Sequence, residues 1–220
     1  MEPTTIKKVE LLAPAGDINS LRAAIEAGCD AVYLGGKQFG ARAYSNNFTK
    51  EDLVEAIKLC HLYGVKVYVT CNTIIYENEV PDFLDYVRFL HQNNVDAILI
   101  QDLGMLDLVH KKFPNLEIHS STQMHIHNLD DVKLMESLGI KRVVLARETS
   151  IDTIKDIKAH SNIDLEIFVH GSLCISYSGE CLMSSLIGGR SGNRGMCAGT
   201  CRLPYNVLSN HKIINKNEPY

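Results

Sequence analysis

A repeated pattern of hydrophobic and polar positions predicts seven β-strands along the chain. In six instances a helix-like segment ends near Gly or Asn, and a short run rich in β-branched residues follows within a few positions. Short apolar runs bounded by turn residues are typical of buried strands. The expected strands, with the turns that lead into them, are residues 27–34, 63–70, 94–100, 115–119, 139–145 and 162–169, preceded by a first strand at residues 9–13.

The segments between these runs have helical periodicity. In residues 20–27 the apolar positions fall at i, i+3 and i+4. Thr49 stands just before Glu51 and Asp52, which gives a helix an N-cap and acidic side chains in its first turn. Strands that alternate with helices form a parallel sheet with right-handed crossovers. The expected fold class is therefore α/β, in the form of a TIM-type (β/α) barrel.

This barrel is expected to be incomplete, with seven strands visible and the eighth missing. The alternative is a doubly wound open sheet, but residues 13–17 lack the G-x-G-x-x-G dinucleotide fingerprint. The expected organisation is barrel repeats in residues 1–171, a Cys/Gly/Arg-rich loop in residues 172–204, and a hairpin opening a truncated C-terminal region in residues 205–220. Because an open barrel exposes two strand edges, either the chain is a fragment or a partner closes the barrel.

Polar residues follow the predicted strands, where barrel enzymes place their active sites. A His–Glu–His set on neighbouring strands can bind a divalent metal, activate water, or orient a carboxylate substrate together with an arginine. Taken singly, each such residue is more often a hydrogen-bonded structural group. The candidates are His119, Glu148 and His170 as catalytic residues, and Asn72, Gln101, Gln123 and Arg147 as substrate-binding residues.

Four cysteines form a run near the end of the chain, Cys174-x6-Cys181-x15-Cys197-x3-Cys201, among many glycines. Glycine disfavours a helix, so this stretch needs another source of order. A metal or an iron–sulfur cluster bound by the thiolates supplies it, because ligand binding is then folding energy. The alternative is four reduced core thiols, which is the interpretation for Cys29, Cys60 and Cys71.

Composition and charge narrow the class of protein further. Hydrophobic residues make up 45% and charged residues 22%, as in soluble globular domains. No apolar run is long enough to span a membrane, and residues 1–8 contain no apolar signal segment, so we expect a cytoplasmic protein with reduced thiols. Residues 182–220 hold five Lys/Arg and one Glu. Their basic excess predicts that Arg190, Arg194 and Arg202 bind phosphate or carboxylate, unless the loop is simply solvated.

Residues 166–184 resemble the signature of the collagenase-like peptidase family, peptidase family U32. The stretch reads Glu-Ile-Phe-Val-His-Gly-Ser-Leu-Cys-Ile-Ser-Tyr-Ser-Gly-Glu-Cys-Leu-Met-Ser. The resemblance extends to residues 12–16, 39–43 and 194–197, and so covers nearly the whole chain. Members of the family look longer at the C-terminus, which agrees with the missing eighth strand.

The resemblance implies one of two activities. Some members are named for collagen cleavage, without an accepted catalytic residue set. Others act in oxygen-independent hydroxylation of pyrimidines in tRNA or rRNA, or of a quinone precursor. Several of these bind a four-iron cluster through four cysteines, and the RNA-hydroxylating members are linked to prephenate as a co-substrate. Carried over, Cys174, Cys181 and Cys197 match ligand positions, and the fourth ligand is either Cys201 or a cysteine further downstream.

The residues favour RNA hydroxylation over proteolysis. A protease needs an activated nucleophile or a metal-bound water, and neither G-x-S-x-G nor H-E-x-x-H occurs in the chain. Hydroxylation without oxygen needs a redox centre and a site that tolerates anions, which a cysteine run with arginines suits. A collagenase-like, metal-dependent protease is the alternative enzyme. A non-enzymatic iron–sulfur accessory subunit, whose protein partner completes the barrel, is the third hypothesis.

Overall fold

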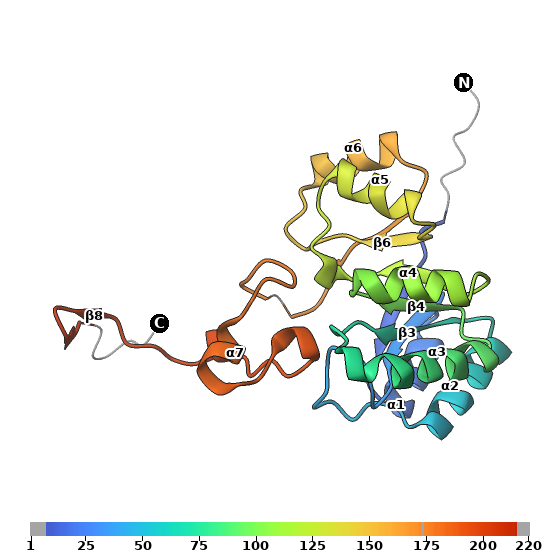
Figure 1. Cartoon of the computed structure of the whole chain (residues 1–220), viewed down its shortest axis with the longest axis horizontal. Helices are drawn as coiled ribbons and strands as arrows, with labels where there is room; N and C mark the ends of the chain where they lie inside the picture. The colour runs from blue at the N-terminus through green and yellow to red at the C-terminus, as the bar shows by residue number, and fades with distance from the viewer. Residues whose placement is uncertain (1–7, 173, 215–220) are drawn as a thin grey trace.

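The computed structural model describes residues 8–172 and 174–214, and it contains one curled parallel sheet of seven strands (Figure 1). Each strand pairs with its neighbours in chain order, from the first to the seventh. This order is that of a (β/α) barrel. In a doubly wound sheet, the order of the strands along the sheet would reverse near its middle. The strands are β1 (Leu12–Ala15), β2 (Ala31–Gly35), β3 (Lys66–Cys71), β4 (Ala97–Ile100), β5 (Glu117–Ser120), β6 (Arg142–Val144) and β7 (Asp164–Glu166).

Helices connect the strands and cover the outer face of the sheet (Figure 1). Most begin at a polar side chain that accepts a hydrogen bond from the first turn. The predicted N-cap Thr49 is confirmed, and it also forms a reciprocal capping box with Asp52. The helices are α1 (Ile18–Glu26), α2 (Lys50–Leu62), α3 (Val80–Gln92), α4 (Leu103–Lys112), α5 (Leu129–Ser137) and α6 (Ile151–His160), with short 3₁₀ turns η1 (Glu77–Glu79) and η2 (Thr122–Met124).

The core lies on both faces of the sheet, because successive side chains of a strand point in opposite directions. The larger cluster fills the space between sheet and helices, and includes Val67, Val69 and Cys71 of β3. A smaller cluster on the inner face includes Tyr68 and Leu99. The prediction of core thiols is confirmed for Cys29, Cys60 and Cys71, which are all buried.

Two predicted strand boundaries are wrong. The first strand begins at Leu12, and Val9 lies exposed before it. The seventh strand ends at Glu166 instead of residue 169, so His170 lies beyond the sheet. The reason is a change of partner in the preceding strand: the amide of Leu145 donates to the carbonyl of Glu166 at 3.0 Å, but the next amide, of Ala146, donates to Ile126 at 2.8 Å.

The Cys/Gly/Arg-rich loop contains a short helix, contrary to the expectation that its glycines exclude one. Helix α7 (Met183–Gly188) forms because the glycines cluster after it, and the buried side chain of Ser184 anchors it. In Figure 1 this segment lies beside the sheet and the hairpin projects farther out. The predicted hairpin is confirmed as β8 (Leu208–Ser209) and β9 (Lys212–Ile213), and residues 215–220 lie outside the described residues. The loop also contains the turns η3 (Gly192–Arg194) and η4 (Thr200–Arg202).

Among the described helices, none is both long enough and apolar enough to cross a lipid bilayer.

Candidate functional site

Asn72 joins three connections at the carboxyl ends of the strands, called here the rim. It follows β3 directly, and only 8% of its surface is exposed. Its Oδ1 accepts a hydrogen bond from the amide of Ala41 at 3.0 Å, and its Nδ2 donates to Oγ of Ser121 at 3.1 Å. Because the amide uses both of its ends, it fixes the loop after β2 and the turn after β5 to β3.

The cysteine loop lies on this rim. The carbonyl of Asn193 accepts hydrogen bonds from Nε2 of Gln101 and from the amide of Ile74, both at 3.2 Å. The carbonyl of Gly195 accepts from the amide of Ala43 at 3.0 Å. Gly195 has a φ of +76°, and a Cβ there would lie 2.6 Å from the carbonyl oxygen of Gly40. Only glycine fits so close to a neighbouring backbone.

The cysteine loop also contacts the rim through its own residue Ser178, whose side chain is buried. Its Oγ accepts from Nε of Arg147 at 3.2 Å and donates to Oε2 of Glu148 at 3.3 Å. The neighbouring Gly179 sits so close to the carbonyl of Gln123 that a Cβ would overlap it. Three of the predicted rim residues are therefore brought together by one turn of the loop.

His119 and His170 do not join them. His119 is fully buried on the inner face of the sheet, with its ring edge against Tyr68 at a centroid distance of 4.7 Å. His170 is exposed past the end of β7. Within residues 8–172 and 174–214, no three His, Cys, Asp or Glu side chains are gathered as a metal ion requires. The predicted set His119, Glu148 and His170 therefore does not fit a divalent metal, and the catalytic roles of these three residues stay predictions.

The surroundings of His119 keep it neutral. Burial lowers the pKa of its ring, and the hydrogen bond to Glu117 only partly offsets burial. Its Nε2 therefore carries the proton and donates to Oε1 of Glu117 at 2.8 Å. Its Nδ1 is buried without a hydrogen-bond partner among the described residues.

A charged network that was not predicted from the sequence lies on the inner face, centred on Arg142 of β6. Nη1 of Arg142 donates to Oε1 of Glu10 at 2.6 Å and lies 3.7 Å from Oε2 of Glu166. The guanidinium also lies over the ring of Tyr68, 5.1 Å from its centroid, and Tyr68 donates to Glu10 at 3.0 Å. The network could have been predicted from one sequence pattern, namely charged residues at inward-facing positions of strands that are otherwise apolar.

The two carboxylates of this network differ in their pKa. Burial raises the pKa of Glu10, but its hydrogen bond to Arg142 and the arginine charge outweigh burial, so the pKa is lowered. Burial also raises the pKa of Glu166, and here it prevails over Arg142, giving a value of about 7. The charge of Glu10 raises it further, and Tyr33 of β2 faces the same carboxyl. Glu166 therefore binds a proton in the folded protein near neutral pH.

Replacing Glu166 by glutamine should flatten the pH dependence of stability between pH 4.5 and about 7. The raised pKa means that stability from this group is complete below pH 4.5 and is lost as the pH rises through about 7. The loss is on the order of 3 kcal/mol. Urea unfolding at pH 5 and pH 7.5 measures it. The control Glu55→Gln, at an exposed site, should keep the wild-type difference, and an equal difference in Glu166→Gln would contradict the assignment.

The four cysteines of the loop are exposed or half-exposed, unlike the three core thiols. A Cβ placed on Gly192 would lie 3.8 Å from both the carbonyl oxygen of Cys181 and the Cβ of Cys197, so these two segments approach each other. The sulfur of Cys197 accepts a hydrogen bond from Oγ of Ser184 at 3.8 Å and from the amide of Gly199 at 3.4 Å. Accessible thiols with donors aimed at sulfur suit an iron–sulfur cluster in chemical type. The four sulfurs are not gathered in the described residues.

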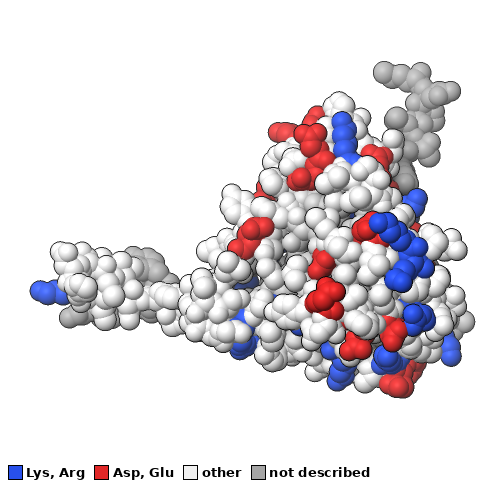
Figure 2. Space-filling view, in the orientation of Figure 1, with Lys and Arg blue, Asp and Glu red and all other residues white. Residues whose placement is uncertain are grey.

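The three arginines of the loop differ in their surroundings. Arg190 donates through Nε to the carbonyl of Met196 at 3.2 Å and lies over the ring of Tyr44. Arg194 pairs with Glu79, and Arg202 lies exposed in η4. In Figure 2 acidic side chains gather over α5 and α6, whereas the projecting hairpin shows basic but no acidic side chains on the face drawn. On this face the projecting hairpin is therefore set apart from the acidic side chains over α5 and α6.

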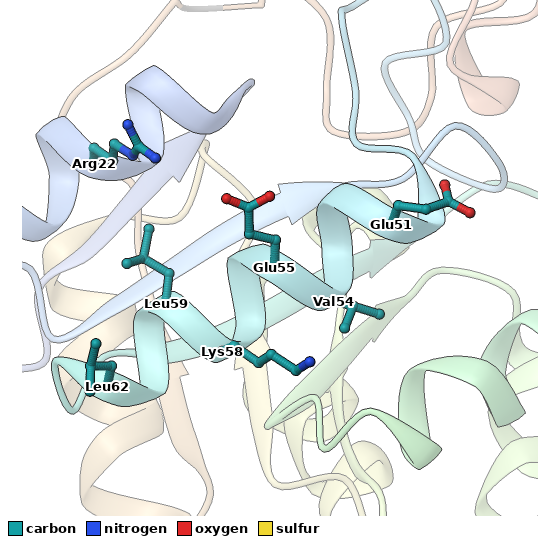
Figure 3. Close-up of a pocket in the computed structure, with 7 residues that line it drawn as sticks. All are labelled: Arg22, Glu51, Val54, Glu55, Lys58, Leu59 and Leu62. Carbon is teal, nitrogen blue, oxygen red and sulfur yellow. The ribbon is translucent and has the colours of Figure 1, made fainter.

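A surface hollow of about 490 Å³ lies away from the rim, between α1 and α2 (Figure 3). Its lining includes Arg22 of α1 and Glu55 and Leu59 of α2. It contains none of the predicted site residues, so we do not connect it with the rim.

Comparison with known proteins gives consistent matches along the chain. The family model described as peptidase family U32 matches residues 16–219. A 23S rRNA 5-hydroxycytidine C2501 synthase of Escherichia coli is 42% identical over 200 residues, which are 91% of this chain and 30% of that protein. The tRNA hydroxylation protein P1 of Bacillus subtilis is 39% identical over 201 residues, which are 91% of this chain and 48% of that protein.

A further relative carries a different name. A collagenase of Porphyromonas gingivalis is 35% identical over 215 residues, covering 92% of this chain and 51% of that protein. This chain thus spans between 30% and 51% of the length of these three relatives. A solved structure described as a U32 peptidase superposes with a TM-score of 0.61 at 12% identity, covering 75% of this chain and 71% of the other. At that identity it supports the fold alone.

Proposed function

The chain belongs to peptidase family U32, and on that premise we propose that it is part of an enzyme that hydroxylates a pyrimidine of tRNA or rRNA without molecular oxygen. The observation that carries the proposal is the 42% identity with a 23S rRNA 5-hydroxycytidine synthase over 91% of this chain. Such a match includes both the barrel and the cysteine loop that rests on its rim. The substrate class is therefore a structured RNA, with its phosphates near the basic loop.

We further propose a four-iron cluster held by Cys174, Cys181, Cys197 and Cys201. When bound, the cluster would supply electron transfer. The hydrogen bonds from Ser184 and Gly199 to the sulfur of Cys197 would stabilise its thiolate form. The accessibility of all four thiols supports the proposal, because a core thiol would be buried.

Two further components are proposed, a carboxylate co-substrate at the rim and an additional strand at the open edges of the sheet. Arg147 at the rim would orient a small carboxylate co-substrate of the prephenate type, since a guanidinium pairs well with carboxylates. Beyond β7, Ile167, Phe168 and Val169 are exposed, as is Val9 before β1. We propose that a further strand, from a protein partner or from additional chain, pairs at these edges and covers the apolar side chains.

A collagenase-like protease is the second candidate, and the relative of that name at 35% identity favours it. At the rim, however, the buried hydroxyl of Ser178 bonds Arg147 and Glu148. A serine nucleophile requires a neighbouring base such as histidine. The hydrogen bonds of Ser178 instead support a binding role for this part of the rim.

Deleting the gene should remove one hydroxylated pyrimidine from tRNA or rRNA, because the proposed enzyme forms that nucleoside. Mass spectrometry of nucleosides from the deletion strain measures the loss, which should be complete for the affected nucleoside. The wild-type gene and a surface variant, Arg88→Ala, should both restore it. An unchanged profile together with gelatin hydrolysis by the pure protein would favour the protease. An unchanged profile without hydrolysis would favour a non-enzymatic accessory subunit.

A further inference from the structure

Arg194 of the cysteine loop donates three side-chain hydrogen bonds to the segment between β3 and α3. Its Nη1 donates to the carbonyl of Ile74 at 2.6 Å and to Oε2 of Glu79 at 2.8 Å. Its Nη2 donates to Oε1 of the same carboxylate at 2.6 Å. The pairing is bidentate, and both side chains are about three-quarters buried, with 22% and 26% exposed. A planar guanidinium and a carboxylate match in this geometry, and a lysine could not reproduce it.

Glu79, the partner of Arg194, is also held by a hydrogen bond within its own turn. Oε2 of Glu79 also accepts from the amide of Tyr76 at 2.9 Å, which fixes the carboxylate in the turn that leads into α3. The ring of Tyr76 then lies under the guanidinium, 4.1 Å from its carbon. The pairing lowers the pKa of Glu79, so the carboxylate is ionised at neutral pH.

The residues on either side of Arg194 are bound to the rim as well. Asn193 accepts from Gln101 and Ile74, and Gly195 accepts from Ala43. Cys197 follows two residues later, and its position depends on where this tripeptide docks. Of the contacts between the tripeptide and the rim, the ion pair is the one that joins two charges across the interface.

We propose that Arg194 and Glu79 form a latch that positions the segment of Cys197 over the rim. Arg194 is then a positioning residue, and it does not bind substrate phosphate as the charge pattern of the sequence predicts. The carboxylate of Glu79 already neutralises the charge of Arg194, and the ring of Tyr76 covers one face of its guanidinium. The inference rests on the proposed function only in treating Cys197 as a cluster ligand. The ion pair itself is a property of the folded chain and does not depend on that function.

Hydrogen exchange of two amides tests the latch directly. The amides of Ile74 and Ala43 donate to the loop carbonyls, so their protection reports docking of the loop. In Glu79→Gln and in Arg194→Lys both should exchange at least about tenfold faster, since opening of the interface controls exchange. The amide of Val67, bonded to Asp96 within the barrel, should keep its rate. The control Asp85→Asn breaks a surface pair on α3 and should change neither loop amide.

Exchanging the two charges, in the double variant Glu79→Arg with Arg194→Glu, should restore part of the protection lost in the single variants. Unchanged exchange in both Glu79→Gln and Arg194→Lys would overturn the proposal. So would an equal acceleration in Asp85→Asn, because the effect would then not depend on the latch.

Salt dependence of RNA binding separates the latch from a phosphate contact. For a short single-stranded RNA, Arg194→Gln should leave the slope of log affinity against log salt unchanged. A phosphate contact would instead lower the slope by about 0.7 for a single strand. A lower slope with unchanged amide exchange would assign Arg194 to phosphate and overturn the latch. If the protein binds no RNA at all, the proposed function fails, while the exchange result still decides the latch.

Discussion

Replacing Arg142 by alanine should lower the free energy of unfolding by about 3–5 kcal/mol, the usual cost of removing one partner of a buried ion pair. The side chain is only 11% exposed, and it stands between Glu10 and Glu166. Without it, Glu166 loses the cation beside it, and Glu10 keeps Lys66, whose Nζ lies 3.6 Å from its Oε2. The variant also loses the packing of the guanidinium on Tyr68.

The loss should be smaller at pH 5 than at pH 7.5. Arg142 opposes the upward shift that burial gives the pKa of Glu166, so without the arginine this carboxyl holds its proton more strongly. At pH 5 Glu166 is already neutral, and the variant leaves fewer uncompensated charges. Urea unfolding of wild type and Arg142→Ala at the two pH values measures the difference.

Arg88→Ala is the matched control for this prediction. Arg88 is 55% exposed and pairs with Asp85 on the surface of α3. Pairs of that kind contribute about 0–1 kcal/mol. If Arg142→Ala cost no more than Arg88→Ala, the inner network would not stabilise the fold. A triple variant that also carries Glu10→Gln and Glu166→Gln should recover part of the loss.

Replacing Cys181 by serine should abolish the hydroxylated nucleoside and leave the barrel folded. Serine is a poor ligand for iron, so the proposed cluster would be lost. The thiol is half-exposed in the loop, away from the core, and its removal should cost the barrel little stability. Nucleoside mass spectrometry of the complemented deletion strain measures the activity. Iron and sulfide content after anaerobic purification, together with circular dichroism, measures the cluster and the fold.

The matched control removes a buried core thiol, Cys60, in place of an accessible loop thiol. Cys60 is buried between sheet and helices, where burial raises its pKa to about 12. Cys60→Ala should keep iron and modification but lower stability by a few kcal/mol at most, through the cavity it leaves. A Cys181→Ser protein with full iron and a full complement of the nucleoside would contradict the cluster.

Several features of the site were predictable from local sequence. Asn72, Gln101, Arg147 and Glu148 follow predicted strands, and the structure places all four at the rim. Because parallel strands end at one edge, a residue just after a strand reaches the rim whatever its distant partners are. His119 lies within β5, and alternation directs it to the inner face, so it is buried below the rim.

The number and order of the strands, the N-cap of α2, the hairpin and the core thiols were all predictable from local sequence. These features depend on periodicity and turn residues within a few positions, which a local pattern contains. Three features depend on long-range contacts: the end of β7, the pairing of Glu10 with Arg142 across 132 residues, and that of Arg194 with Glu79 across 115. Such pairings arise when the curled sheet and the returning loop bring distant segments together, and no local pattern specifies which distant charge becomes the partner.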